Sequence, residues 1–230
     1  MKPEEVRGRI EEIGIVASIR VESKEDALFA AEAVSQTGIP AIEIALTLEA
    51  APEVISYLAQ QDPQLIVGAG SVLNVELAQR CLDAGARFLT SDRLHLPLLE
   101  FAGKKEIAVF PGALTPTEVI TAWETGCDFV KVVPCAQIGG EAYIRSLRRM
   151  FPKIRLIAAG GVDQQTASNY ILAGASALGI GRELIPAGAI RRREGDRIHE
   201  LTHRYIRFVK SAREGRLPQP EGVYLRYPKN

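Results

Sequence analysis

The stretch Phe129-Val130-Lys131-Val132-Val133-Pro134-Cys135 is apolar, rich in β-branched residues and interrupted by a proline near its end. This composition is typical of a short buried β-strand. A lysine inside such a strand is unusual, because removing an ammonium group from water costs free energy. Burial favours the neutral amine, which is a nucleophile, so Lys131 is a candidate Schiff-base lysine. The alternative is a lysine whose stem is buried while its ammonium group reaches the solvent.

Apolar stretches of this kind recur along the chain, and each is followed by a predicted helix. The eight predicted strands cover residues 14–20, 41–46, 65–68, 87–90, 107–110, 129–133, 155–159 and 177–180. The helices that follow them are predicted at 23–38, 52–59, 75–84, 96–102, 116–125, 141–149, 166–173 and 199–214, with a short leading helix at 3–13. Repeated strand–helix units predict a parallel sheet, and eight of them predict a (β/α)₈ TIM barrel. An open doubly wound sheet would more naturally have fewer strands and a glycine-rich turn after the first, and no such turn follows Arg20.

The length, charge balance and cysteine content of the chain fit one large domain and exclude several other classes of protein. The 230 residues are predicted to form a single barrel domain at about 14–210, followed by an extended, proline-bearing tail at about 215–230. Lys+Arg and Asp+Glu are equal at 28 each, which argues against nucleic-acid binding. The three cysteines share no metal-type spacing, so we expect reduced thiols, no metal site and a cytoplasmic location. The charged N-terminus predicts no signal peptide, and no apolar run is long enough to span a membrane.

A second charged residue interrupts another apolar strand. Glu43 lies within Ala41-Ile42-Glu43-Ile44-Ala45, where alternation places it on the same face as two alanines. If this face lines the barrel, Glu43 has open space beside it and is suited to carrying protons as a general acid/base. The alternative is a purely structural ion pair with Lys131. Because a buried ion pair adds little net stability, we favour a functional pair.

Polar residues and glycine-rich turns at the carboxyl ends of the strands are candidates for substrate binding, because active sites of such barrels lie there. These candidates are Arg20, Gly70, Ser71, Thr90, Gly160, Gly161, Gly181 and Arg182. The turns after the seventh and eighth strands are expected to bind a phosphate or another anion through backbone N–H groups. Both could instead be tight turns without a ligand. Arg20 could bind a carboxylate, or could be a solvated strand end.

Several of these segments together resemble one known family. The matching blocks are Ala41-Ile42-Glu43-Ile44, Gly68-Ala69-Gly70-Ser71-Val72-Leu73-Asn74, Phe110-Pro111-Gly112, Val130-Lys131-Val132-Val133-Pro134 and Gly160-Gly161-Val162. From about residue 14 to about residue 190, the chain resembles the class I aldolases for 2-keto-3-deoxy-6-phosphogluconate and 4-hydroxy-2-oxoglutarate. The resemblance implies a Schiff base between Lys131 and pyruvate or a 2-keto acid, with Glu43 as the general acid/base.

The same resemblance implies roles for other residues and an assembly. Ser71 stands where the family usually has threonine and would hold the keto-acid carboxylate. Gly160, Gly161 and Gly181 match the phosphate-binding turns of the family. The resemblance also implies a homotrimer and no metal or organic cofactor.

Some positions depart from the family pattern, and they lie where a substrate would be selected. Thr47 replaces an arginine that many members carry four residues after the glutamate, and Arg20 is the nearest substitute. After the fourth strand the family usually has a proline, whereas this chain has Asp92, whose charge would repel a keto-acid carboxylate unless Arg20 or Arg93 offsets it. Arg182 replaces a serine, and could strengthen phosphate binding or fill the pocket.

The resemblance therefore implies a lyase that acts on a 2-keto acid. We expect cleavage of a 2-keto-3-deoxy-6-phospho sugar acid or of 4-hydroxy-2-oxoglutarate to pyruvate and an aldehyde, which is glyceraldehyde 3-phosphate or glyoxylate. Two alternatives remain. One is a related aldolase for an unphosphorylated or galactonate-type keto acid, and the other is a non-catalytic barrel that binds a phosphorylated ligand.

Overall fold

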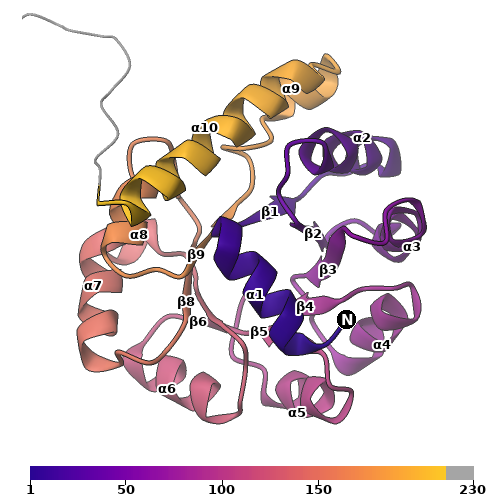
Figure 1. Cartoon of the computed structure of the whole chain (residues 1–230). Helices are drawn as coiled ribbons and strands as arrows, with labels where there is room; N and C mark the ends of the chain where they lie inside the picture. The colour runs from indigo at the N-terminus through magenta and orange to yellow at the C-terminus, as the bar shows by residue number, and fades with distance from the viewer. Residues whose placement is uncertain (216–230) are drawn as a thin grey trace, which may run out of the picture.

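A ring of parallel strands surrounded by helices makes up the described part of the computed structural model, residues 1–215 (Figure 1). The strands are β1 (Ile15–Ile19), β2 (Ala41–Ala45), β3 (Ile66–Gly70), β4 (Phe88–Thr90), β5 (Ala108–Phe110), β6 (Gly112–Ala113), β7 (Val130–Val132), β8 (Leu156–Ala159) and β9 (Ala177–Ile180). They pair in the order β5-β4-β3-β2-β1-β9-β8-β7-β6. The predicted tail lies outside the described residues, from 216 onward.

The two strands at the ends of this order are consecutive segments of the chain. β5 pairs with β4 and β6 pairs with β7, and only Pro111 separates β5 from β6. A proline has no N–H to donate to the ladder, so it divides one strand into two segments. β5 and β6 therefore correspond to the single predicted strand at 107–110 and its continuation. The predicted (β/α)₈ barrel is confirmed.

Helices cover the outside of the ring, and a leading helix crosses one of its ends (Figure 1). They are α1 (Pro3–Ile13), α2 (Lys24–Ser35), α3 (Ala51–Gln61), α4 (Val75–Asp83), α5 (Leu96–Lys104), α6 (Pro116–Glu124), α7 (Gly140–Met150), α8 (Ala167–Leu172), α9 (Ala187–Arg191) and α10 (Gly195–Arg213), with a 3₁₀-helix η1 (Ala136–Ile138). The short helices α9 and η1 were not predicted, because neither is long enough to show a helical period. Among residues 1–215, no helix has the length and apolar character needed to cross a membrane.

Side chains cap the N-termini of α2 and α6, and both helices begin where the sequence predicts. The last helix, α10, begins at Gly195, before its predicted start at residue 199. The Ser23 hydroxyl accepts a hydrogen bond from the Asp26 N–H at the start of α2, as expected from their spacing. At the start of α6, Thr115 and Glu118 form a complete capping box. Each cap satisfies N–H groups that the first helical turn leaves without a partner.

The strands alternate between two apolar layers. Ile42 and Ile44 of β2 point outward into the core between sheet and helices. The inward residues form a second cluster with α1, made of Val6, Ile10, Val16, Ala41, Ile66, Phe88, Ala108, Phe110, Phe129, Ile157 and Ala177. Most of these lie early in their strands, so α1 covers the amino end of the barrel. The carboxyl end is left for polar side chains.

The third strand continues past its predicted end at residue 68, so Gly70, which was expected in a turn after this strand, belongs to the strand itself. Gly68 and Gly70 lie inside β3. A Cβ added to Gly68 would lie 2.3 Å from Cζ of Phe88, and one added to Gly70 would lie 2.4 Å from Cδ of Glu43. These glycines make room inside the barrel for larger side chains of the neighbouring strands.

Candidate active site

A cavity of about 820 Å³ opens at the carboxyl ends of the strands. Its volume lies within the usual range for small-molecule sites. Predicted site residues that line it are Arg20, Glu43, Thr90, Lys131, Gly160, Gly161, Gly181 and Arg182. The remaining two predicted residues lie behind this wall: Gly70 faces the Glu43 side chain, and Ser71 contacts two residues of the wall.

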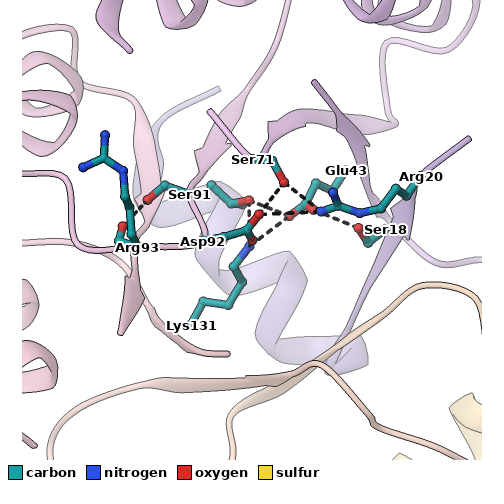
Figure 2. Close-up of polar contacts among 9 residues, drawn as sticks. Ser18, Arg20, Glu43, Ser71, Ser91, Asp92, Arg93 and Lys131 are labelled. Carbon is teal, nitrogen blue, oxygen red and sulfur yellow. Dashed lines mark hydrogen bonds and ion pairs between the residues drawn. The ribbon is translucent and has the colours of Figure 1, made fainter. Parts of the chain in front are cut away.

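The Lys131 amine points into a cluster of polar side chains inside the barrel (Figure 2). Lys131 is 6% exposed, so the alternative of an ammonium group that reaches the solvent is wrong. Its Nζ donates to Oδ1 of Asp92 at 2.9 Å and to Oγ1 of Thr90 at 3.1 Å. The same nitrogen lies 4.0 Å from Oε2 of Glu43. β7 therefore presents an amine between two carboxylates.

Two hydroxyl groups hold Glu43 in this position. Oε1 of Glu43 accepts a hydrogen bond from Oγ of Ser18 at 2.8 Å, and Oε2 accepts one from Oγ1 of Thr90 at 2.7 Å. Glu43 is 4% exposed and shares its face of β2 with two alanines, as the alternation predicts. Because Thr90 accepts from Lys131 and donates to Glu43, its hydroxyl connects the amine to the carboxylate.

Asp92 has a larger part in the site than the sequence indicates. Its Oδ2 accepts a hydrogen bond from Oγ of Ser71 at 2.5 Å and lies 3.6 Å from Nη2 of Arg20. Burial acts to raise the pKa of Asp92, but the Lys131 charge, the hydrogen bonds from Ser71 and Lys131, and the Arg20 charge together hold it below its usual value. Asp92 is therefore ionised at neutral pH.

Of the two arginines expected to offset Asp92, only Arg20 does so. Nη2 of Arg20 donates to Oγ of Ser71 at 2.7 Å, on the side where Ser71 meets Asp92. The Arg93 guanidinium points away from the cluster (Figure 2), and its Nη2 reaches the Leu73 carbonyl oxygen at 3.4 Å. Of the two alternatives, Arg20 is therefore the one that the structure supports, because the chain turns after Asp92 and directs the Arg93 side chain outward.

The glycine-rich turns after β8 and β9 form the opposite wall of the cavity. Gly160 and Gly161 have φ angles of 79° and 89°, in the left-handed region that favours glycine. A Cβ on Gly161 would lie 2.4 Å from Cβ of Ala136, so the tight turn alone requires a glycine there. Beyond Gly181, the Arg182 side chain is 88% exposed, and its Nε lies 3.5 Å from Oε1 of Glu183. Arg182 does not fill the pocket.

Two residues of the cluster, Ser18 and Asp92, were not among the predicted site residues. Ser18 is one small polar residue in an apolar strand, and only the β1–β2 pairing brings it opposite Glu43. Asp92 lies beyond the end of β4, where acidic residues are common in loops. Two features of the sequence could have identified Asp92: it follows the end of a strand, and it continues the alternation of the inward-facing Phe88 and Thr90.

The arrangement combines a buried amine, which can act as a nucleophile, with carboxyl and hydroxyl groups, which can carry protons. A parallel (β/α)₈ barrel with such a site at its carboxyl end fits a carbon–carbon lyase of the aldolase type. The family model described as KDPG and KHG aldolase matches residues 6–201. The chain belongs to this family of aldolases.

Relatives and solved structures cover most of the chain. The KHG/KDPG aldolase of Escherichia coli (strain K12) is 32% identical over 197 residues, which are 85% of this chain and 92% of that protein. The 2-dehydro-3-deoxy-6-phosphogalactonate aldolase of the same organism is 29% identical over 205 residues, or 87% of this chain and 95% of that protein. The crystal structure of KDPG aldolase from Legionella pneumophila, with pyruvate captured at low pH as a covalent carbinolamine intermediate, superimposes with a TM-score of 0.79 at 27% identity, covering 85% of this chain and 95% of that one.

Proposed function

We propose that this protein is a class I aldolase that cleaves a 2-keto-3-deoxy-6-phospho sugar acid or 4-hydroxy-2-oxoglutarate to pyruvate and an aldehyde, with Lys131 as its Schiff-base residue. The observation that carries the proposal is the Lys131 amine, which is buried and directed into the cavity between Thr90 and Asp92. A buried lysine that contacts the space for a ligand is suited to attack a carbonyl group.

The amine must lose a proton before it attacks, and the site offers a path for that proton. Nζ of Lys131 donates to the Thr90 hydroxyl at 3.1 Å, and this hydroxyl donates to Glu43 at 2.7 Å. A proton can therefore pass from the ammonium group through Thr90 to the Glu43 carboxylate. The lowered pKa of Asp92 makes Asp92 a poor proton acceptor. Because the Thr90 hydroxyl connects the amine to Glu43, Glu43 is the base in this proposal.

The neutral amine then forms a bond to C2 of the keto acid, and the carbinolamine loses water to give a protonated imine. Glu43 returns its proton to the departing hydroxyl group. In the cleavage step Glu43 takes the proton of the C4 hydroxyl, the C3–C4 bond breaks, and its electron pair moves toward the imine nitrogen. The aldehyde leaves, and the enamine of pyruvate stays on Lys131. Protonation at C3 and addition of water release pyruvate and restore the amine.

The remaining site residues are proposed to bind the two ends of the substrate. Arg20 and Ser71 contact Asp92, which in turn contacts Lys131, and they would offer charge and a hydroxyl group to the keto-acid carboxylate. At the far wall, the backbone of Gly160, Gly161 and Gly181 and the exposed Arg182 would bind a phosphate. Support for a phosphorylated substrate comes from the relative that is named for a 6-phosphogalactonate.

Two alternatives to this substrate keep specific support. The 29% identity to the phosphogalactonate enzyme supports a galactonate-type keto acid. Arg182 pairs with Glu183 and is therefore not reserved for a phosphate, which keeps an unphosphorylated keto acid as an alternative. A non-catalytic barrel is less well supported, because it would bury Lys131 and Glu43 together without using either. The homotrimer and the cytoplasmic location stay predictions.

Trapping of the imine tests the proposal directly. The protein is incubated with pyruvate, reduced with borohydride, digested, and examined by peptide mass spectrometry. We expect an adduct on Lys131 and none in Lys131→Arg. The variant Lys104→Arg, which changes an exposed lysine paired with Glu100, is the matched control and should keep the adduct. Cleavage of a keto acid by Lys131→Ala would contradict the proposal, as would a folded protein that forms no adduct at any lysine.

A further inference from the structure

The groups proposed for the substrate carboxylate already contact a carboxylate of the chain itself. Oγ of Ser71 donates to Oδ2 of Asp92 at 2.5 Å, and Nη2 of Arg20 lies 3.6 Å from the same oxygen. A carboxylate is an acceptor-only group, so Asp92 uses the same donors that a keto acid would use. The carboxylate subsite is therefore occupied by a side chain.

The other oxygen of Asp92 lies against the reacting nitrogen. Oδ1 of Asp92 is 2.9 Å from Nζ of Lys131. In an imine the substrate carbon is bonded to this nitrogen, so a carboxylate on that carbon must also lie within a few ångströms of Nζ. A substrate carboxylate and Asp92 would then share one small region, and like charges so close repel each other.

The charges of the cluster are balanced before any substrate binds. Lys131 and Arg20 supply two positive charges, while Glu43 and the ionised Asp92 supply two negative ones. A 2-keto acid adds a negative charge without a free positive partner. A neutral carbonyl compound adds none, and a hydroxyl group beside its carbonyl can donate a hydrogen bond to Asp92.

We propose that Asp92 is a specificity-determining residue, which disfavours a carboxylate beside the reacting carbonyl and accepts a hydrogen bond from a hydroxyl group in the same place. With Asp92 in this place, the site would accept α-hydroxy ketones, in addition to 2-keto acids, as the carbonyl compounds that form an imine with Lys131. This inference rests on the proposed role of Lys131, and it specifies which carbonyl compounds bind next to the Lys131 amine. Asp92 weakens the binding of pyruvate without preventing the reaction.

Hydroxyacetone and pyruvate form a matched pair of probes, because they share a methyl ketone and differ only in a CH₂OH or a carboxylate group. With either one, the amine nitrogen bonds to the carbonyl carbon, and the carbonyl oxygen leaves as water with the two amine protons. Borohydride then delivers hydride to the imine carbon, and the nitrogen takes a proton from water. The adduct on Lys131 is therefore stable and can be counted by mass spectrometry.

The test compares the wild-type protein with Asp92→Asn and Glu22→Gln over a range of probe concentrations. Asparagine has the shape of aspartate and can still contact Ser71 and Lys131, so the fold should be kept. Glu22 lines the same cavity, and its replacement removes the same charge at an exposed position away from the cluster. We expect Asp92→Asn to raise the affinity for pyruvate, relative to that for hydroxyacetone, by about tenfold or more, since contacts with charged groups are worth this much. Glu22→Gln should leave the ratio within about twofold, because exposed charges are screened by solvent.

An unchanged ratio in Asp92→Asn would overturn the inference while leaving Lys131 as the Schiff-base residue. If Glu22→Gln changed the ratio of the two affinities as much as Asp92→Asn does, the inference would also be overturned, because the effect would then come from the total charge of the cavity. If neither probe forms an adduct in the wild-type protein or in Asp92→Asn, the proposed function fails and the inference fails with it. A pyruvate adduct that appears only in Asp92→Asn would support the inference about Asp92, but would contradict the proposed function of the wild-type protein.

Discussion

Oε2 of Glu43 lies 4.0 Å from Nζ of Lys131, and the Thr90 hydroxyl forms a hydrogen bond with each of them. The two charged groups are therefore joined more closely through Thr90 than through direct contact. From this relationship we propose a proton-carrying role for Thr90, which its position at the end of β4 alone does not indicate.

Replacing Thr90 tests this role. Thr90→Val has nearly the same volume but no hydroxyl, so we expect kcat and the rate of imine trapping to fall about 10- to 100-fold, because a positioned proton carrier contributes at least this much. Thr90→Ser restores the hydroxyl and should recover most of the rate. Thermal unfolding of each variant checks that the barrel is intact. Equal rates in the valine and serine variants would contradict the proton path.

Glu43→Gln should slow turnover while the fold survives. The amide has the shape of the carboxylate and can still form hydrogen bonds with Ser18 and Thr90, but it cannot take a proton at neutral pH. We expect kcat to fall about 10²- to 10⁴-fold, the usual contribution of a general acid/base. Glu53→Gln, at an exposed ion pair with Lys24, is the control and should keep full activity. Steady-state cleavage assays with purified variants give the comparison.

Gly70 is expected to act through Glu43. A Cβ at position 70 would lie 2.4 Å from Cδ of Glu43, so Gly70→Ala must push the carboxylate away from Thr90. We expect at least a tenfold loss of kcat, because small displacements of catalytic groups are costly. Gly103→Ala is the matched control, since a Cβ there meets no atom within 4 Å. Wild-type activity in Gly70→Ala would show that Glu43 tolerates the shift or is not required.

The sequence predicts the parts of this molecule that depend on local pattern. Lys131 and Glu43 are detectable because each is a charge in an apolar strand, and the repeat of strand, helix and glycine predicts the barrel. The contacts around them depend on strand register, which no local pattern fixes. Asp92 could be expected to repel a substrate, but its contact with Lys131 joins β7 to a loop that follows a different strand. The end of the third strand was predicted too early for a related reason. Gly68 and Gly70 leave space for Phe88 and Glu43 of neighbouring strands, and the local sequence does not show these contacts.

Arg182 should matter only for phosphorylated substrates. Its side chain is 88% exposed on the far wall of the cavity, where it can reach a phosphate without touching the reacting carbon. We expect Arg182→Gln to raise KM for a 6-phospho sugar acid about tenfold, with little change in kcat and no change in KM for 4-hydroxy-2-oxoglutarate. Arg192→Gln, which removes an arginine paired with Glu194, serves as control. An unchanged KM for every phosphorylated substrate would favour an unphosphorylated one.

The stability of the protein should depend on the charge of Asp92 in acid. The folded state lowers the pKa of Asp92, so the stabilisation from its ionised form is present above the unfolded pKa of about 3.9 and is lost as pH falls through the folded value. Near neutral pH, the free energy of unfolding of the wild-type protein should therefore be higher than that of Asp92→Asn. The difference should be less than about 1 kcal/mol, because the Asp92 side chain is about half exposed to solvent. The difference should shrink below about pH 4, where a protonated aspartate resembles asparagine. Urea unfolding at a series of pH values measures it.

Asp128 provides a contrast of opposite sign in the same experiment. Burial raises the pKa of Asp128, and the hydrogen bond from the Val109 N–H and the charge of Arg7 offset this only in part. Its proton therefore binds more tightly in the folded state, so ionisation costs stability as pH rises from the unfolded pKa through the folded one. Relative to the wild-type protein, Asp128→Asn should gain stability as pH rises above the unfolded pKa of about 3.9, whereas Asp92→Asn should lose stability as pH rises toward that value from below. If the free energy of unfolding, relative to the wild-type protein, changed with pH in the same direction in both variants, the pKa shift of one of the two carboxylates would have the opposite sign to the one expected from its surroundings.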